Sequence, residues 1–244
     1  DGGWVRPRET VNEEVLSWGA RIPDWSQDID MPRIAAMGRD AQPGLLIVDR
    51  TVHGPYENYQ TPEQRIPEKQ LPNPWESCMT LATNWGHVPG DTYKSPGQVI
   101  HSLIEVVAKG GSLLLGVGPK PDGTLPEDAT TRMAAVGKWL RKNGDAIYGT
   151  RTVGDYHQGN VWFTQKKDSS LHYALVTIDT KNPLTSVVTW RNHVPKKGSK
   201  VVLLETGKAV NWSVDKGALT VTIPASVRAA MGEQPALAFS FIPE

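Results

Sequence analysis

The chain has 244 residues, of which 39% are hydrophobic, enough for a buried core and one or two domains. Lysine plus arginine and aspartate plus glutamate number 26 each, so charge gives no reason to expect a nucleic acid or an anionic membrane as partner. A single cysteine, Cys78, excludes an intramolecular disulfide framework, and no apolar run is long enough to span a bilayer.

The first part of the chain alternates apolar strands with amphipathic helices, as in a parallel sheet. Residues 45–48 (Leu-Leu-Ile-Val) form a continuous apolar run, which is typical of a strand buried on both faces. The sequence predicts helices at residues 32–39, 96–109 and 127–148, strands at 45–48, 75–82 and 112–119, and a long loop at 51–74.

After residue 150 the pattern changes to short strand-like runs separated by turns that contain Gly, Asn, Asp and Lys-Lys-Gly. Strands are predicted at residues 161–163, 172–178, 187–190, 201–204, 219–223 and 236–242. Runs of this length and spacing are typical of an antiparallel sandwich. The sequence therefore predicts an α/β part at residues 1–150, followed by an all-β antiparallel sandwich at residues 151–244.

Polar residues follow the predicted strands, and catalytic groups in parallel sheets and barrels lie at the carboxyl ends of strands. Asp49 and Arg50 follow the strand at 45–48, and Asn84, Trp85 and His87 follow the next one. The nine tryptophans of the chain are either core residues or surfaces that stack on sugar rings. A neutral substrate such as a sugar agrees with the balanced charge.

Three carboxylates are candidates for chemistry. Glu57 and Glu63 lie in the long loop, and Asp1 opens the chain in the sequence Asp-Gly-Gly-Trp. Two glycines after an acidic residue are typical of a strand end that a ligand approaches closely, although a chain terminus without fixed structure explains Asp1 as well. Retaining glycoside hydrolysis needs two carboxylates within ~5 Å of each other. For Glu57 the alternative is a solvated surface charge.

Histidines and glycines give no sign of a metal or phosphate site. His53 and His87 lack carboxylates at a metal-ligand spacing, so hydrogen-bonding or structural roles are expected for them. The glycines of residues 110–118 lack the Gly-Lys-Ser/Thr of a phosphate-binding loop.

An ordered series of motifs resembles the α-L-fucosidases of glycoside hydrolase family 29. The motifs are Asp1-Gly2-Gly3-Trp4, Val48-Asp49-Arg50, Thr61-Pro62-Glu63-Gln64, Trp75-Glu76-Ser77, Asn84-Trp85-Gly86, residues 109–119 (KGGSLLLGVGP) and Asp122-Gly123. The resemblance implies a partial TIM-like (β/α) barrel at residues 1–150 and the family's C-terminal β-sandwich at residues 151–244. It also implies that the first half of the barrel precedes Asp1, so that any signal sequence would lie upstream.

The resemblance further implies a retaining exo-α-L-fucosidase with a covalent fucosyl intermediate on Asp1. Glu63 matches the acid/base position in several members, and Glu57 is the alternative. Arg50, Trp85 and Trp4 match residues that contact the sugar. The family's chemistry requires no metal and no cofactor.

The implied partner is a fucosylated oligosaccharide or glycoconjugate, and the implied location is extracytoplasmic: periplasmic, secreted or lysosomal. Two other interpretations stay open at this point. One is a non-catalytic carbohydrate-binding or scaffolding protein, and the other is a fragment of the enzyme that is inactive alone. The sequence predicts neither the linkage preference nor the oligomeric state.

Overall fold

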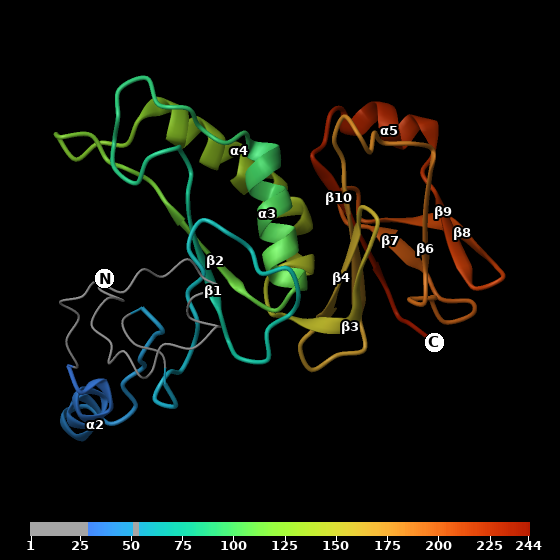
Figure 1. The fold of residues 1–244 in the computed structure, drawn as a ribbon. Helices are drawn as coiled ribbons and strands as arrows, with labels where there is room; N and C mark the ends of the chain where they lie inside the picture. The colour runs from blue at the N-terminus through green and yellow to red at the C-terminus, as the bar shows by residue number, and fades with distance from the viewer. Residues whose placement is uncertain (1–28, 51–53) are drawn as a thin grey trace.

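The computed structural model describes residues 29–50 and 54–244, which form two parts (Figure 1). One part is α/β and runs to about residue 149, and the other is an antiparallel β-module. Helices α3 and α4 lie between the parallel strands of the first part and the β-module (Figure 1). No helix of the described residues is long and apolar enough to cross a membrane.

The helices of the α/β part confirm the predicted pattern. They are α2 (Met31–Ala41), α3 (Pro96–Ala108) and α4 (Glu127–Asn143), the last followed by the short 3-10 helix η2 (Gly144–Ala146). Helix α3 begins with a reciprocal cap: the Ser95 side chain accepts from the Gln98 N–H, and the Gln98 side chain accepts from the Ser95 N–H. Its apolar face is buried through residues that include Ile100 and Ile104.

Two parallel strands are regular: β1 (Glu76–Thr80) and β2 (Ser112–Gly116), paired from Glu76 with Ser112 to Thr80 with Gly116. The strand predicted at residues 45–48 is wrong in its extent and burial. Only a parallel bridge from Val48 to Tyr59 forms there, and Leu46 is 66% exposed. Burial on both faces requires a layer on each side of the strand, and no described residue covers the Leu46 side chain to that extent.

The loop predicted at residues 51–74 also proves to be partly ordered as sheet. Parallel bridges join Gln60 to Trp75 and Glu63 to Cys78. Residues 59–64 therefore run beside β1 as a further extended, strand-like segment, and such a segment or strand of the parallel sheet is called a row below. The loop was predicted because prolines, which are rare inside strands, stand at 55, 62, 67, 72 and 74. Pro62 has no N–H to donate, but its carbonyl can still accept. The Cys78 N–H donates to this carbonyl at 3.0 Å, so proline is tolerated in the row.

The β-module is one eight-stranded antiparallel sheet with the order β3-β4-β5-β10-β7-β8-β9-β6. Its strands are β3 (Thr150–Gln158), β4 (Val161–Lys166), β5 (His172–Thr177), β6 (Val187–Arg191), β7 (Val201–Leu203), β8 (Lys208–Asp215), β9 (Ala218–Thr222) and β10 (Ala236–Phe241). Strands β3 and β8 and the helix α5 (Ala225–Met231) were not predicted. The prediction of an antiparallel all-β module is confirmed.

The predicted sandwich takes the form of a single sheet that curls until its two outer strands meet. The Gln158 side chain of β3 accepts a hydrogen bond from the Arg191 N–H of β6 and donates one to its carbonyl, both at 2.7 Å. The sheet is thus nearly closed into a barrel around a core that includes Phe163, Trp190 and Phe239.

A second core joins the two parts. Ile104 of α3 and Trp139 of α4 pack in one buried cluster with Leu175 of β5 and Ala236 of β10. The Trp139 indole N–H also donates to the Ala236 carbonyl at 2.8 Å. The outer face of the β-module therefore supplies part of the core that the helices need.

Candidate active site

The candidate site lies at the carboxyl ends of four parallel rows. Residues 46–49 pair with the start of the row 59–64, that row pairs with β1, and β1 pairs with β2. All of these pairings are parallel, so the residues that end each row lie on the same edge of the sheet. The rows end near Arg50, Glu63, Thr80 and Gly116, respectively.

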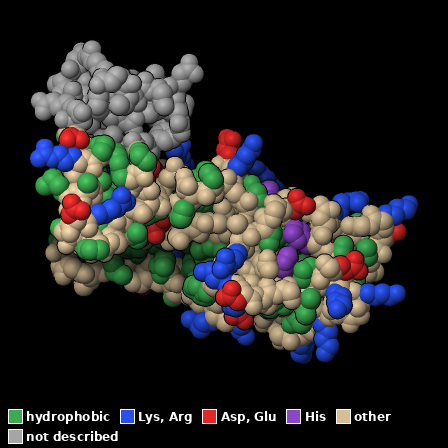
Figure 2. Space-filling view, turned by 90° about the horizontal axis from the view of Figure 1, so that it is seen from below, with side chains coloured by type: hydrophobic (Ala, Val, Ile, Leu, Met, Phe, Trp, Pro, Cys, Tyr) green, Lys and Arg blue, Asp and Glu red, His purple; other side chains and the backbone are tan. Residues whose placement is uncertain are grey.

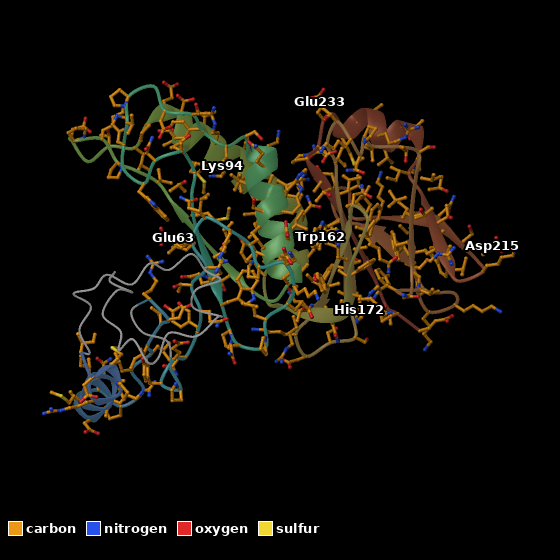
Figure 3. The ribbon with its side chains drawn as sticks, viewed as in Figure 1. Glu63, Lys94, Trp162, His172, Asp215 and Glu233 are labelled. Atoms are coloured by element: carbon orange, nitrogen blue, oxygen red, sulfur yellow. The ribbon has the colours of Figure 1, made fainter. Side chains whose placement is uncertain are left out.

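Arg50 and Glu63 meet at this edge. The Arg50 Nη1 atom lies 2.8 Å from the Glu63 Oε2 atom, and the two side chains are 32% and 43% exposed. Glu63 lies beside β1, well away from Trp162 and His172 of the β-module (Figure 3). The pair is therefore a charged, solvent-accessible feature of the α/β part alone.

Asp49 brings the row of Glu63 to the row of Arg50. Its Oδ1 atom accepts hydrogen bonds from the Thr61 N–H at 2.8 Å and from the Thr61 hydroxyl at 2.7 Å. The Asp49 carboxylate thus links the two neighbouring rows. The link is made at Thr61, two residues before Glu63. The pattern Asp-Arg followed by Thr-x-Glu was visible in the sequence, but the link between its members was not.

Glu57 lies elsewhere. Its Oε1 atom accepts from the Gly54 N–H at 2.9 Å, and its own N–H donates to the Gly54 carbonyl at 3.1 Å, which closes a tight turn. The row that follows is extended from Tyr59 to Glu63. Glu57 and Glu63 consequently lie towards opposite ends of the row, and only Glu63 reaches the carboxyl edge.

Trp85 projects from the loop after β1 and is 46% exposed. Its ring lies over the end of β2, because a Cβ atom placed on Gly116 would be 3.6 Å from two of its ring atoms. Trp85 thus lies in a loop rather than in the core. An exposed indole at this edge can pack on the apolar face of a ring-shaped ligand.

The loop that carries Trp85 is held by local polar contacts. The Asn84 N–H and side-chain amide donate to Asp91 Oδ2 at 3.1 and 3.2 Å. At Gly118 any side chain would collide, since a Cβ atom there would lie 2.4 Å from the His87 N atom. These close contacts fix the direction in which the loop leaves the sheet.

The described residues contain no group of three or more His, Cys, Asp or Glu side chains that could hold a metal ion. His87 Nδ1 is buried without a hydrogen-bond partner among them. Three residues singled out in the sequence, namely Asp1, Trp4 and His53, lie outside the described residues.

Comparison with known proteins identifies the family of the chain. The profile described as "Alpha-L-fucosidase" matches residues 1–145, and the profile described as "Alpha-L-fucosidase C-terminal domain" matches residues 154–241. The chain belongs to the α-L-fucosidase family. The resemblance drawn from the sequence motifs is confirmed.

Relatives agree with this assignment. Plasma α-L-fucosidases of Rattus norvegicus and Homo sapiens are 32% and 33% identical to the chain, over 70% of its length. The chain spans only 38% of the length of each of these two fucosidases.

Solved structures agree as well. α-L-Fucosidase isoenzyme 1 from Paenibacillus thiaminolyticus gives a TM-score of 0.74 at 28% identity, covering 87% of this chain and 53% of that one. The Thermotoga maritima α-fucosidase in complex with fucose gives 0.69 at 26% identity, covering 87% and 48%.

Proposed function

We propose that the protein that carries this chain is a retaining exo-α-L-fucosidase, with its site at the carboxyl edge of the parallel rows. The observation that carries the proposal is the contact between Arg50 and Glu63 at 2.8 Å on that edge, in a chain of the α-L-fucosidase family. Catalytic carboxylates of (β/α) barrels come from the ends of different strands. The four parallel rows also support a partial TIM-like barrel in this part of the chain.

In the proposed reaction, the Asp1 carboxylate attacks the anomeric carbon of fucose while the bond to the aglycone oxygen breaks. The Glu63 carboxylic acid gives its proton to that oxygen. The resulting Glu63 carboxylate then takes a proton from water, whose oxygen attacks the anomeric carbon and releases Asp1. Two displacements on the same carbon return fucose with its original configuration.

Glu63 is a better acid/base than Glu57 on geometric grounds. A general acid must come within hydrogen-bond reach of the leaving oxygen, which a residue at the carboxyl edge can do. Glu57 lies towards the opposite end of its row and is engaged in the turn at Gly54. We therefore keep Glu63 as the acid/base and Glu57 as the alternative for the test below.

We assign sugar contacts to Arg50, Trp85 and Trp4, as the family resemblance implies. The guanidinium of Arg50 supplies hydrogen-bond donors beside Glu63, and the exposed Trp85 ring suits the apolar face and methyl group of fucose. The substrate would be a fucosylated oligosaccharide or glycoconjugate. The proposed steps use no metal and no cofactor.

We also propose the domain division at residues 1–150 and 151–244, and an extracytoplasmic location. The start of β3 at Thr150 and the family profiles ending at 145 and beginning at 154 support the division. Fucosylated glycans lie outside the cytoplasm, and relatives carry the name plasma α-L-fucosidase.

The nucleophile is tested in the full-length protein with Asp1→Gly. We expect release of fucose from an aryl fucoside to fall to background, and added azide to restore turnover with a β-fucosyl azide product, because azide takes the place of the missing carboxylate. A variant with wild-type turnover would exclude Asp1. Binding of fucosides without turnover in the unmodified protein would favour a carbohydrate-binding role instead.

The acid/base is tested by comparing Glu63→Ala with the matched variant Glu57→Ala. Aglycones that are poor leaving groups need protonation, so Glu63→Ala should slow them by about 10²- to 10⁴-fold and affect activated aryl fucosides far less. Glu57→Ala should leave the ratio of the two rates near that of wild type. The reverse result would transfer the role to Glu57.

A further inference from the structure

We infer that Gln64 is a positioning residue: its side-chain amide locks the end of the row that carries Glu63 onto β1. The inference rests on the proposed role of Glu63 as the acid/base. It comes from the way in which the parallel hydrogen-bond ladder ends at this point.

The ladder between the row and β1 continues up to Gln64, with one donor missing at Pro62. The Glu76 N–H donates to the Gln60 carbonyl at 2.9 Å, the Cys78 N–H donates to the Pro62 carbonyl at 3.0 Å, and the Gln64 N–H donates to the Cys78 carbonyl at 2.8 Å. The next bond of such a ladder would join the Thr80 N–H to the Gln64 backbone carbonyl.

That bond is replaced by one to the side chain. The Thr80 N–H lies 3.3 Å from Gln64 Oε1, and Gln64 Nε2 donates to the Thr80 hydroxyl at 3.1 Å. Gln64 has a positive φ of 54°, which turns its backbone away from the row. The side-chain amide thus acts as a substitute peptide group and continues the ladder by one step after the main chain has left it.

The partner side of this contact is fixed. Thr80 is 1% exposed, its hydroxyl donates to the Ala82 carbonyl at 2.5 Å, and its own carbonyl accepts from Lys94 Nζ at 2.5 Å. Gln64 itself lies at the surface. The amide therefore holds a surface segment to a rigid, buried strand end rather than to another loop.

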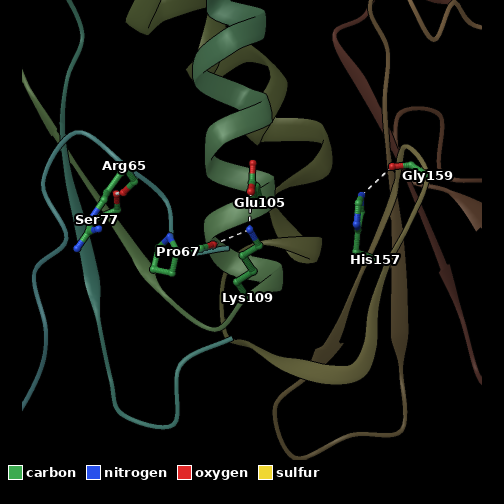
Figure 4. Close-up of polar contacts among 7 residues, drawn as sticks. All are labelled: Arg65, Pro67, Ser77, Glu105, Lys109, His157 and Gly159. Carbon is green, nitrogen blue, oxygen red and sulfur yellow. Dashed lines mark hydrogen bonds and ion pairs between the residues drawn. The ribbon is translucent and has the colours of Figure 1, made fainter. Parts of the chain in front are cut away.

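A second anchor follows one residue later. The hydroxyl of Ser77, a fully buried residue of β1, donates to the Arg65 carbonyl at 2.6 Å (Figure 4). Positive φ at a residue other than glycine persists only where the surroundings hold it. The contacts at Thr80 and Ser77 supply that restraint on both sides of the turn at Gln64.

The restraint matters because Glu63 is the residue immediately before the turn. Its side chain is 43% exposed, so packing around it does not by itself fix its position. Displacement of a catalytic group by about 1 Å can cost about 10²-fold in rate. Gln64 would thus affect the step in which Glu63 protonates the leaving group.

The test uses the full-length protein with Gln64→Gly and Gln64→Ala, and measures kcat/KM on aryl fucosides with poor and with activated leaving groups. Glycine accepts the positive φ freely, so Gln64→Gly removes the side chain and its amide without adding backbone strain. We expect both variants to lose about tenfold or more on poor leaving groups and about twofold or less on activated ones. Gln64→Glu keeps an acceptor for the Thr80 N–H and should recover part of the ratio.

The matched control is Gln70→Ala in the same loop. Gln70 Nε2 bonds the Ala108 carbonyl at 3.3 Å and the Val153 carbonyl at 3.0 Å, away from β1, so its loss reports general loosening of the loop. We expect it to change both classes of substrate equally. Retention of activity on the activated substrate also shows that each Gln64 variant is folded.

A double variant shows whether Gln64 acts through Glu63. Gln64→Ala should cause no further loss on poor leaving groups when Glu63 is already alanine, because the group that it positions is absent. An undiminished further loss in that background, or equal losses on both substrates in Gln64→Ala and Gln64→Gly, would overturn the inference. If Glu63→Ala alone shows no dependence on the leaving group, the proposed acid/base role fails and this inference fails with it.

Discussion

The β-module and the α/β part bury their apolar residues in different ways. The module encloses its own core, in which Phe163, Leu237 and Phe239 are fully buried. The parallel sheet has instead an open face, where Leu46 is 66% and Leu114 50% exposed. Figure 2 shows hydrophobic side chains on this face of the molecule over both parts. A sheet that closes on itself needs no second layer, whereas a parallel sheet needs one on each face.

The difference extends to the helices between the two parts. Helices α3 and α4 bury their apolar faces against Leu175 and Ala236 of the module rather than against the parallel sheet alone. The α/β part thus shares a buried core with the module, whereas Leu114 on the opposite face of its sheet is exposed. The candidate site lies in the α/β part.

The largest expected effect compares two leucines on strands. Leu237→Ala in β10 should lower the free energy of unfolding of residues 1–244 by about 2–5 kcal/mol, because it leaves a cavity in a closed core. Leu114→Ala in β2 should cost less than about 1 kcal/mol, since half of that side chain is already in water. Urea unfolding of both variants measures the difference.

Equal losses of unfolding free energy in the two leucine variants would contradict the comparison. They would mean that Leu114 is packed as tightly as the buried core residues of the module. Val187→Ala serves as the control within the module. Val187 lies on β6 and is 42% exposed, so its truncation should resemble that of Leu114.

The elements that the sequence predicted well share a strong apolar pattern. Helix α3 combines a cap at Ser95 with buried residues at helical spacing, and β5 is a nearly continuous buried strand. Strand β3 was missed because its residues are mostly exposed and its register shifts between Thr152 and His157. The sequence of strand β8 does contain a strand pattern, the alternation of Val210, Trp212 and Val214.

The sequence motifs propose members of the candidate site, but they do not predict the contacts that hold these residues in place. Arg50, Glu63 and Trp85 were chosen from motifs, and the structure brings Arg50 and Glu63 into contact. The support from Asp49 and Gln64 was not predicted, because it depends on strand pairing inside an apparent loop and on a positive φ at a glutamine. Neither feature has a local sequence signal. The roles of these residues stay predictions.

A smaller effect is expected at Lys109, which lies at the end of α3 near β4 of the module. This side chain is 5% exposed, and its Nζ atom donates to the Pro67 carbonyl at 2.7 Å and to Glu105 Oε1 at 2.6 Å (Figure 4). The same atom lies 5.9 Å from the centre of the Trp162 ring of β4. Lys109→Met keeps the apolar stem but removes the donor to the Pro67 carbonyl and to Glu105, so it should cost about 1–3 kcal/mol in urea unfolding.

Lys138→Met is the matched control for Lys109, because Lys138 is an exposed residue of α4, where a change should stay within about 0.5 kcal/mol. If the two parts unfold in separate transitions, the loss in Lys109→Met should fall mainly on the transition of the α/β part. A loss confined to the transition of the β-module would show that Lys109 stabilises the module rather than the α/β part.

The smallest effect concerns the pH dependence of the module. Burial, together with the charge of nearby His193, lowers the pKa of His172 below its ordinary value of 6.5. The His172 ring lies 5.9 Å from that of His193 and 6.1 Å from that of Phe241, and its Nδ1 atom is buried without a partner among the described residues. The folded module therefore favours neutral His172, whereas the unfolded chain protonates it near pH 6.5.

The contribution of His172 to stability is fully present above pH 6.5 and is lost as the pH falls through the lowered pKa of the folded state. His172→Gln should flatten this part of the profile of unfolding free energy against pH. This pH dependence would belong to the module, because His172 lies on β5. A slope that survives in His172→Gln would assign it to other groups and remove this part of the comparison.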